Sequence, residues 1–146
     1  MKKTTVIMLA AVFAGATVLE SCKKYEDGPS LSFRSRKERV ANTWKIEKQL
    51  QGGVEQSNPS TGTITFDKDG NVSATYTSFG ITITVSGTWQ LVNNDEDLEV
   101  KTTYNGVSTT STVNILKLKE KELWVKDPGN DANSSGDDVE THYIPA

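Results

Sequence analysis

The sequence is poor in the residues that most often build catalytic and metal centres, since its 146 residues include one cysteine and one histidine. The lone cysteine, Cys22, cannot close a disulfide within the chain, so packing and hydrogen bonds must stabilise any folded domain. The lone histidine, His142, excludes a cluster of histidine ligands or a pair of imidazole bases. No Gly-x-Ser-x-Gly nucleophile motif accompanies the many serines. We therefore predict that the protein is not an enzyme and that it uses no metal and no cofactor.

Long hydrophobic runs and an excess of positive charge are also missing. The formal net charge is -3, which argues against nucleic acid as a partner because such binding favours a basic surface. The apolar run at residues 6–14 is shorter than the roughly 20 residues that cross a bilayer as a helix. It follows Lys2 and Lys3 and leads into small residues, which is the order of a secretory signal peptide. Residues 1–21 are therefore predicted to be a signal peptide.

The end of this segment, Leu19-Glu20-Ser21-Cys22, resembles a bacterial lipobox. The resemblance implies that Cys22 becomes the mature N-terminus and carries acyl chains that anchor the protein, by our prediction in the outer membrane. A secreted protein with a free thiol is the alternative. Lys23-Lys24-Tyr25-Glu26-Asp27 resembles the stretch after the lipid cysteine in surface-exposed lipoproteins of Bacteroidetes. It equally suits a solvated tether over residues 22–33, so a periplasmic and a cell-surface orientation both stay open.

The remaining residues, 34–146, are predicted to form one domain rich in β structure. Threonine and valine are abundant there, and apolar and polar positions alternate along several segments. One short helix is expected, because Ser35 and Glu38 have the spacing of a capping box. The predicted strands cover about 43–50, 61–66, 71–79, 81–91, 98–104, 107–118, 122–126 and 138–144.

Most of these strands are joined by short turns, of which Asn105-Gly106 is the clearest hairpin signal. About eight antiparallel strands with short connections predict an all-β, up-and-down barrel with a short N-terminal helix. A β-sandwich is the alternative, and it requires longer connections between its two sheets. The residues expected to share one face of the first strand are Trp44, Ile46, Lys48 and Leu50.

Three segments resemble lipocalin-like domains, in particular those of lipocalin-like lipoproteins from Bacteroidetes. Residues 39–46 resemble the short helix and Gly-x-Trp opening of the first strand, with Asn42 in place of the glycine. Residues 64–70 and 87–91 resemble the strand with an Asp-Gly turn and the Gly-x-Trp strand of these proteins. The resemblance implies a calyx that the helix and Trp44 close at one end. It implies no defined substrate, because fold alone does not give function.

Tyr76, Trp89 and Tyr104 fall on the apolar faces of successive predicted strands. They are our candidates for the lining of a ligand pocket, although filling the core is the more common role for such residues, because protein interiors are closely packed. The first functional hypothesis is a lipid-anchored module that binds a small apolar or amphipathic molecule. The alternative is a structural or interaction subunit with a solid barrel, which contacts an envelope protein through an outward-pointing Trp124.

Three polar features are interpreted more simply. His142 is expected to be an exposed strand residue. Asp67 to Gly70 is expected to be a hairpin turn, although its first residues are similar to the start of a calcium loop. The segment from Asp127 to Asp138 is rich in carboxylate and amide oxygens, and whether it binds calcium weakly is left open.

Overall fold

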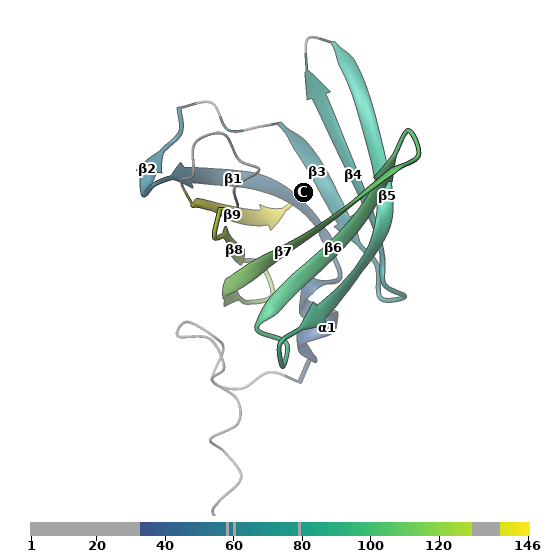
Figure 1. The fold of residues 1–146 in the computed structure, drawn as a ribbon. Helices are drawn as coiled ribbons and strands as arrows, with labels where there is room; N and C mark the ends of the chain where they lie inside the picture. The colour runs from purple at the N-terminus through teal and green to yellow at the C-terminus, as the bar shows by residue number, and fades with distance from the viewer. Residues whose placement is uncertain (1–32, 58, 60, 79, 130–137) are drawn as a thin grey trace, which may run out of the picture.

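The strands form one antiparallel barrel, which Figure 1 shows with α1 at its lower end. The structure is a computed structural model that describes residues 33–57, 59, 61–78, 80–129 and 138–146. The predicted signal peptide and nearly all of the predicted tether lie outside these residues. The elements are α1 (Arg36–Val40), β1 (Thr43–Gln51), β2 (Val54–Glu55), β3 (Gly62–Phe66), β4 (Asn71–Ser78), β5 (Ile81–Val92), β6 (Asp97–Tyr104), β7 (Val107–Leu118), β8 (Leu123–Asp127) and β9 (Val139–Pro145).

Hydrogen bonding between β1 and β9 closes the barrel. Strands β3 to β9 pair with their neighbours in chain order, and β1 pairs with both β3 and β9. Among the described strands, β2 pairs only with the end of β1, and it stands outside the ring. The ring therefore has eight strands, which confirms the predicted up-and-down barrel. A sandwich of two sheets is excluded, because it would not close through one continuous set of paired strands.

The helix forms where the sequence predicts it and covers one end of the barrel. The Ser35 hydroxyl accepts from the backbone N–H of Glu38 at 3.2 Å, and the Glu38 carboxylate accepts from the backbone N–H of Ser35 at 2.8 Å. These bonds favour the ionised carboxylate and lower the pKa of Glu38. Val40 is fully buried, and the indole Nε1 of Trp44 donates to its carbonyl oxygen at 2.8 Å. No helix among the described residues is long and apolar enough to cross a membrane.

The packed core fills the end of the barrel that α1 closes. The rings of Phe66 and Trp89 meet edge to face, with centroids 5.4 Å apart. Burying each large apolar side chain stabilises the fold by roughly 1.5–3 kcal/mol, so this cluster supplies much of the stability of a chain that cannot form an internal disulfide. The buried cluster consists of Val40, Trp44, Phe66, Val72, Trp89, Leu98, Ile115, Leu118, Leu123 and Val125.

A β-bulge interrupts the regular alternation of β1. Ile46 pairs with Tyr143 on β9, and Lys48 pairs with the adjacent His142, which leaves Glu47 as the extra residue. Because successive side chains of a strand point to opposite faces, one extra residue moves every later side chain to the other face.

The prediction that Trp44, Ile46, Lys48 and Leu50 share one face of the first strand is therefore wrong for the residues after this bulge. Trp44 is buried inside the barrel as expected, but Lys48 and Leu50 lie on the outer face. Gln49 instead turns inward, where its side-chain amide donates to the Thr141 hydroxyl at 3.4 Å. The sequence around Glu47 carries no signal for the bulge, because the residue is as polar as its neighbours.

A second bulge falls at Leu116 in β7, where Ile115 and Lys117 pair with successive residues of β8. It places Ile115 and Leu118 inside the barrel although three positions separate them, and both are buried. The bulge explains why strict alternation fails in this part of the strand.

Two hairpin turns use left-handed backbone. Asn105 and Gly106 have φ angles of 49° and 78°, as the Asn-Gly signal predicts for a two-residue turn. The turn between β5 and β6 places Asn93, Asn94 and Asp95 at φ angles of 52°, 58° and 63°. Asparagine and aspartate tolerate this region better than other non-glycine residues, so both turns follow from local sequence.

Candidate functional site

The barrel encloses a cavity of about 320 Å³. The cavity begins on core residues such as Phe66 and Leu98 and extends to exposed residues such as Tyr76 and Thr109, so it opens at the end opposite α1. Its lining consists of Ile64, Phe66, Val72, Ala74, Tyr76, Val85, Leu98, Val100, Thr102, Thr109, Ser111, Val113, Leu123, Val125 and Tyr143. The interior of this barrel is therefore not solid.

The lining is uncharged. Aliphatic and aromatic side chains form most of the wall, and the hydroxyl groups of Thr102, Thr109 and Ser111 lie on β6 and β7. Burying an unpaired charge in such a wall would cost several kcal/mol. The cavity therefore suits a neutral apolar body, with hydrogen-bonding groups available at a few places.

Tyr143 is the most perturbed titratable group of this wall. Tyr143 packs against the core cluster and lines the cavity. It lies beside Leu123, its pairing partner on β8. Burial, with a smaller contribution from Tyr76, raises the pKa of Tyr143 to about 12. The phenol is therefore neutral at physiological pH, and it can donate or accept a hydrogen bond with a molecule in the cavity.

Of the three predicted pocket residues, the structure brings Tyr76 to the cavity. Tyr76 lies on β4 and is 45% exposed. Its partner on the neighbouring strand β5 is Ile83. Tyr104 lies at the tip of the β6–β7 hairpin, is 50% exposed, and pairs with Val107 beyond the cavity lining. Tyr104 lies two residues after the inward-facing Thr102, so its side chain is on the inner face of the strand, as the sequence predicts. At this position, however, the strand extends beyond the residues that line the cavity.

Trp89 belongs to the closed end and is not part of the cavity lining. Its side chain is 4% exposed, and its indole Nε1 donates to the backbone carbonyl of Asp67 at 2.9 Å. The indole therefore joins β5 to the β3–β4 turn and fills the core. This is the core-filling interpretation that the sequence left open beside pocket lining.

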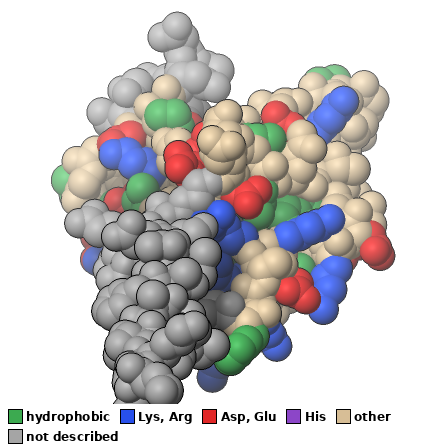
Figure 2. All heavy atoms as spheres, turned by 90° about the horizontal axis from the view of Figure 1, so that it is seen from below, with side chains coloured by type: hydrophobic (Ala, Val, Ile, Leu, Met, Phe, Trp, Pro, Cys, Tyr) green, Lys and Arg blue, Asp and Glu red, His purple; other side chains and the backbone are tan. Residues whose placement is uncertain are grey.

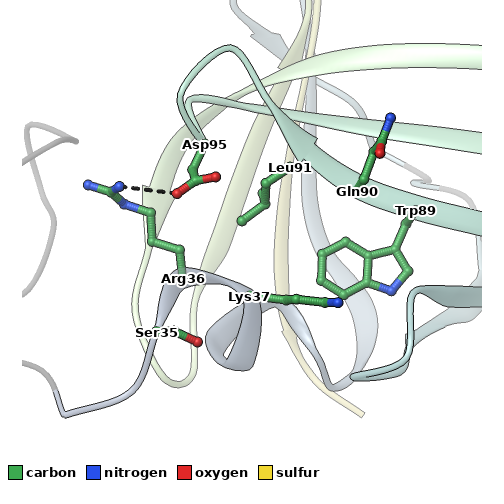
Figure 3. Close-up of a pocket in the computed structure, with 7 residues that line it drawn as sticks. All are labelled: Ser35, Arg36, Lys37, Trp89, Gln90, Leu91 and Asp95. Atoms are coloured by element: carbon green, nitrogen blue, oxygen red, sulfur yellow. Dashed lines mark ion pairs between the residues drawn. The ribbon is translucent and has the colours of Figure 1, made fainter.

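A second hollow, of about 330 Å³, lies outside the barrel between α1 and the end of β5 (Figure 3). Arg36 and Asp95 form an ion pair across it at 3.5 Å, and the Lys37 ammonium lies 5.9 Å from the centre of the Trp89 ring. Figure 2 shows basic and acidic side chains intermixed on this end of the molecule. This hollow is a charged surface feature, quite unlike the uncharged cavity inside the barrel.

Trp124 lies on the outer face of β8, since its neighbours Leu123 and Val125 are buried inside. Its ring stacks on His142 with centroids 3.8 Å apart, and the Lys117 ammonium lies 3.9 Å from its ring centre. The expectation that His142 is exposed is wrong. His142 is 9% exposed, because Trp124 covers it.

The carboxylate-rich segments show mostly local contacts. In the turn after β3, both carboxylate oxygens of Asp67 accept from Asn71, each at 2.7 Å. This confirms the hairpin turn. The loop considered for calcium, from Asp127 to Asp138, lies mostly outside the described residues. The described residues include no group of three or more His, Cys, Asp or Glu side chains that could hold a metal ion.

Sequence reasoning missed several lining residues. The inward face of β6 and β7 includes three hydroxyl residues, Thr102, Thr109 and Ser111, at every second position with the apolar ones. They are easily missed, because polar side chains on a barrel strand are usually expected to face solvent. Tyr143 follows a predicted exposed histidine on the last strand. The periodicity of β6, counted from the inward Leu98, could have identified Thr102.

The architecture and the cavity define the chain as a lipocalin-like β-barrel protein in fold. Its fold is similar to the crystal structure of a lipocalin-like protein from Bacteroides uniformis, with a TM-score of 0.54 and 13% identity over 74% of this chain and 99% of the other. An uncharacterized protein from Bacteroides eggerthii has a TM-score of 0.53 at 13% identity over 73% and 99% of the two chains. No protein-family model and no curated protein matches the sequence. The structural likeness therefore confirms the predicted fold.

Proposed function

We propose that this protein is a membrane-anchored binding module of the cell envelope that holds a small, neutral, apolar or amphipathic molecule inside its barrel. The observation that carries the proposal is the uncharged cavity of about 320 Å³. This volume lies at the lower end of the roughly 300–1,000 Å³ found for small-molecule sites.

The chemistry of the wall supports an amphipathic occupant. Val100, Val125 and Leu98 offer apolar surface to the body of a ligand. The phenol of Tyr143 and the hydroxyl of Thr102 offer hydrogen bonds to a hydroxyl or carbonyl group of the ligand. A ligand with a buried formal charge is disfavoured, because the wall provides no opposite charge to pair with it.

The anchoring part of the proposal rests on the lipobox-like sequence that ends at Cys22. Acyl chains on Cys22 would hold the domain at the membrane, since each buried methylene contributes about 0.8 kcal/mol. Residues 23–35 separate that position from α1 at the closed end of the barrel. The cavity mouth lies at the opposite end, where a ligand in the aqueous envelope can reach it.

The test is binding of a neutral fluorescent apolar probe, N-phenyl-1-naphthylamine, to the protein and to a variant with a filled cavity. Thr102→Trp places an indole in the cavity from β6 and should abolish the rise in probe fluorescence. The matched control is Thr103→Trp, because Thr103 is the next residue along β6 and its exposed side chain points outward.

Binding that survives Thr102→Trp, or that Thr103→Trp removes equally, would rule out the cavity as the binding site. Circular dichroism must show that both variants keep the barrel, because overpacking an interior typically costs 1–3 kcal/mol. Loss of probe binding in the folded Thr102→Trp variant alone supports the proposal.

A further inference from the structure

Within the residues that the structure describes, one edge of the barrel wall has no partner strand. β7 pairs with β6 from Val107 to Asn114, but β8 pairs with β7 only from Asn114 to Leu118. Among the described strands, residues 107–113 therefore have a partner on one side alone. Every second residue of this segment directs its N–H and C=O groups toward the open side. Figure 1 shows this part of β7 rising away from β8 toward the hairpin tip.

This segment, which we call the β7 edge, is accessible and lacks the usual protection of free edges. Residues 107–112 are all exposed. Natural edges are normally guarded by charged side chains, prolines or bulges, because an unpaired strand invites pairing with another chain. The β7 edge reads Val-Ser-Thr-Thr-Ser-Thr-Val. It contains no charge and no proline, and the bulge at Leu116 lies outside it.

The sequence of the β7 edge complements itself when it is reversed. In an antiparallel pairing centred on Thr110, Val107 faces Val113 of the second copy, and Ser108 faces Thr112. Thr109 then faces Ser111, and Thr110 faces its own counterpart. Cross-strand pairs of β-branched and hydroxyl side chains stabilise antiparallel sheets, and no like charges meet in this register.

We propose that two copies of this protein associate through their β7 edges, as an antiparallel pair related by a two-fold axis. Such an interface uses the same residues on both copies, as most two-fold dimers do. Pairing satisfies the open N–H and C=O groups of residues 107–113. It also continues each cavity wall into the partner, because Thr109 and Ser111 of this edge line the cavity.

The upper part of β5 is the rival edge. Residues 81–85 lie beyond Ser86, where the pairing of β5 with β6 begins, and they are also uncharged. This edge is shorter than the β7 edge, so it offers fewer hydrogen bonds to a second copy. The experiment therefore compares the two edges directly.

Disulfide trapping in the full chain, exported by a bacterial host, tests the β7 edge. Thr110→Cys should give a band of twice the monomer mass as the major species on a non-reducing gel. Residues directly opposite in an antiparallel pair have Cα atoms about 4.5–5.5 Å apart, within the range that a disulfide spans. The unsubstituted chain, whose single cysteine is Cys22, sets the background, and Ile83→Cys probes the middle of the β5 edge.

The second measurement tests the register of the proposed pairing, in which Ser108 of one copy lies opposite Thr112 of the other. Ser108→Cys and Thr112→Cys should each stay monomeric when expressed alone, and the two variants carrying different tags should crosslink to each other when co-expressed. A monomeric Thr110→Cys variant would overturn the proposal, and so would dimers trapped through Ile83→Cys instead. If Ser108→Cys or Thr112→Cys formed crosslinked dimers when expressed alone, the crosslinks would come from random collisions. That result would also overturn the proposal. A different protein pairing with this edge would leave Thr110→Cys without a dimer.

Discussion

Gly87 stands where the backbone of β6 approaches β5 closely. A Cβ atom built on it would lie 1.9 Å from the carbonyl oxygen of Lys101, well inside van der Waals contact. The glycine of the Gly-x-Trp segment is therefore required by the approach of a neighbouring backbone. The sequence singled out the segment, but the reason for the glycine lies in the partner strand.

We predict that Gly87→Ala destabilises the protein by more than about 2 kcal/mol, because the strands must separate to admit a methyl group. Urea denaturation followed by tryptophan fluorescence measures the change. Ser86→Ala, at the adjacent exposed position, is the control and should change stability by less than about 0.5 kcal/mol. Equal effects at the two positions would contradict a steric role for Gly87.

Tyr143 allows a prediction about pH. Burial raises its pKa from the ordinary value near 10 to about 12 in the folded protein, so the folded state holds this proton more tightly than the unfolded chain does. Stability should not depend on this group below pH 10, and it should fall as the pH rises through 12, by an amount on the order of 2 kcal/mol.

The measurement is an ultraviolet titration of phenolate absorbance, in the protein and in Tyr143→Phe. The difference between the two curves should titrate close to pH 12. The Tyr143→Phe variant should also lose less stability between pH 10 and 12 than the unsubstituted protein. A difference curve centred near pH 10 would show that Tyr143 is not sequestered from water.

Among the elements, the turn between β5 and β6 is the most unusual. Its residues Asn93, Asn94 and Asp95 occupy the left-handed region in succession. The Asp97 carboxylate holds the turn together by accepting from the side-chain amides of Asn93 and Asn114, the latter at 2.7 Å. Local sequence and a contact from β7 therefore both specify this turn.

We predict that Asn94→Val lowers the free energy of unfolding by about 1–2 kcal/mol, since a β-branched residue is strained at a φ angle of 58°. Asn94→Gly is the matched comparison and should leave stability within about 0.5 kcal/mol of the original. Thermal unfolding of the two variants checks the order. A Gly variant as unstable as the Val variant would show that the asparagine side chain, and not the backbone conformation, matters.

At the same scale, most element boundaries could be predicted, but the side-chain orientations beyond the bulges in β1 and β7 could not. The capping box, the Asn-Gly turn and the period-two pattern are local signals, and each element they predict is present. The bulge at Glu47 depends on how β1 meets β9 across almost the whole chain. For that reason the outward position of Lys48 was not predictable from its neighbours.

On the scale of the whole molecule, the two ends of the barrel differ in character. The hairpin tips at the open end, residues 74–86 and 102–114, contain no charged residue. The helix end carries paired charges, such as Arg36 with Asp95 and Arg34 with Glu120. The chain also reaches the barrel at the helix end, so a lipid on Cys22 would attach on that side.

We predict that Cys22→Ala releases the protein from the membrane pellet into the soluble fraction and abolishes incorporation of labelled fatty acid, because the acyl chains supply the affinity for the bilayer. Immunoblots of the two fractions give the measurement. Ser30→Ala, in the same predicted tether, should remain in the pellet. Unchanged sedimentation of Cys22→Ala would mean that another feature holds the protein to the membrane.

The sequence by itself determined the β class, the short capped helix, most strand boundaries and the hairpin turns, because these depend on residues close together in the chain. Tertiary structure alone decided which aromatic residues line the cavity, with Tyr143 in its wall, Trp89 in the core and Tyr104 beyond the rim. It also decided that the β7 edge has no partner among the described strands. These features depend on where each neighbouring strand ends and how the barrel closes, and those relations join residues that are distant in sequence.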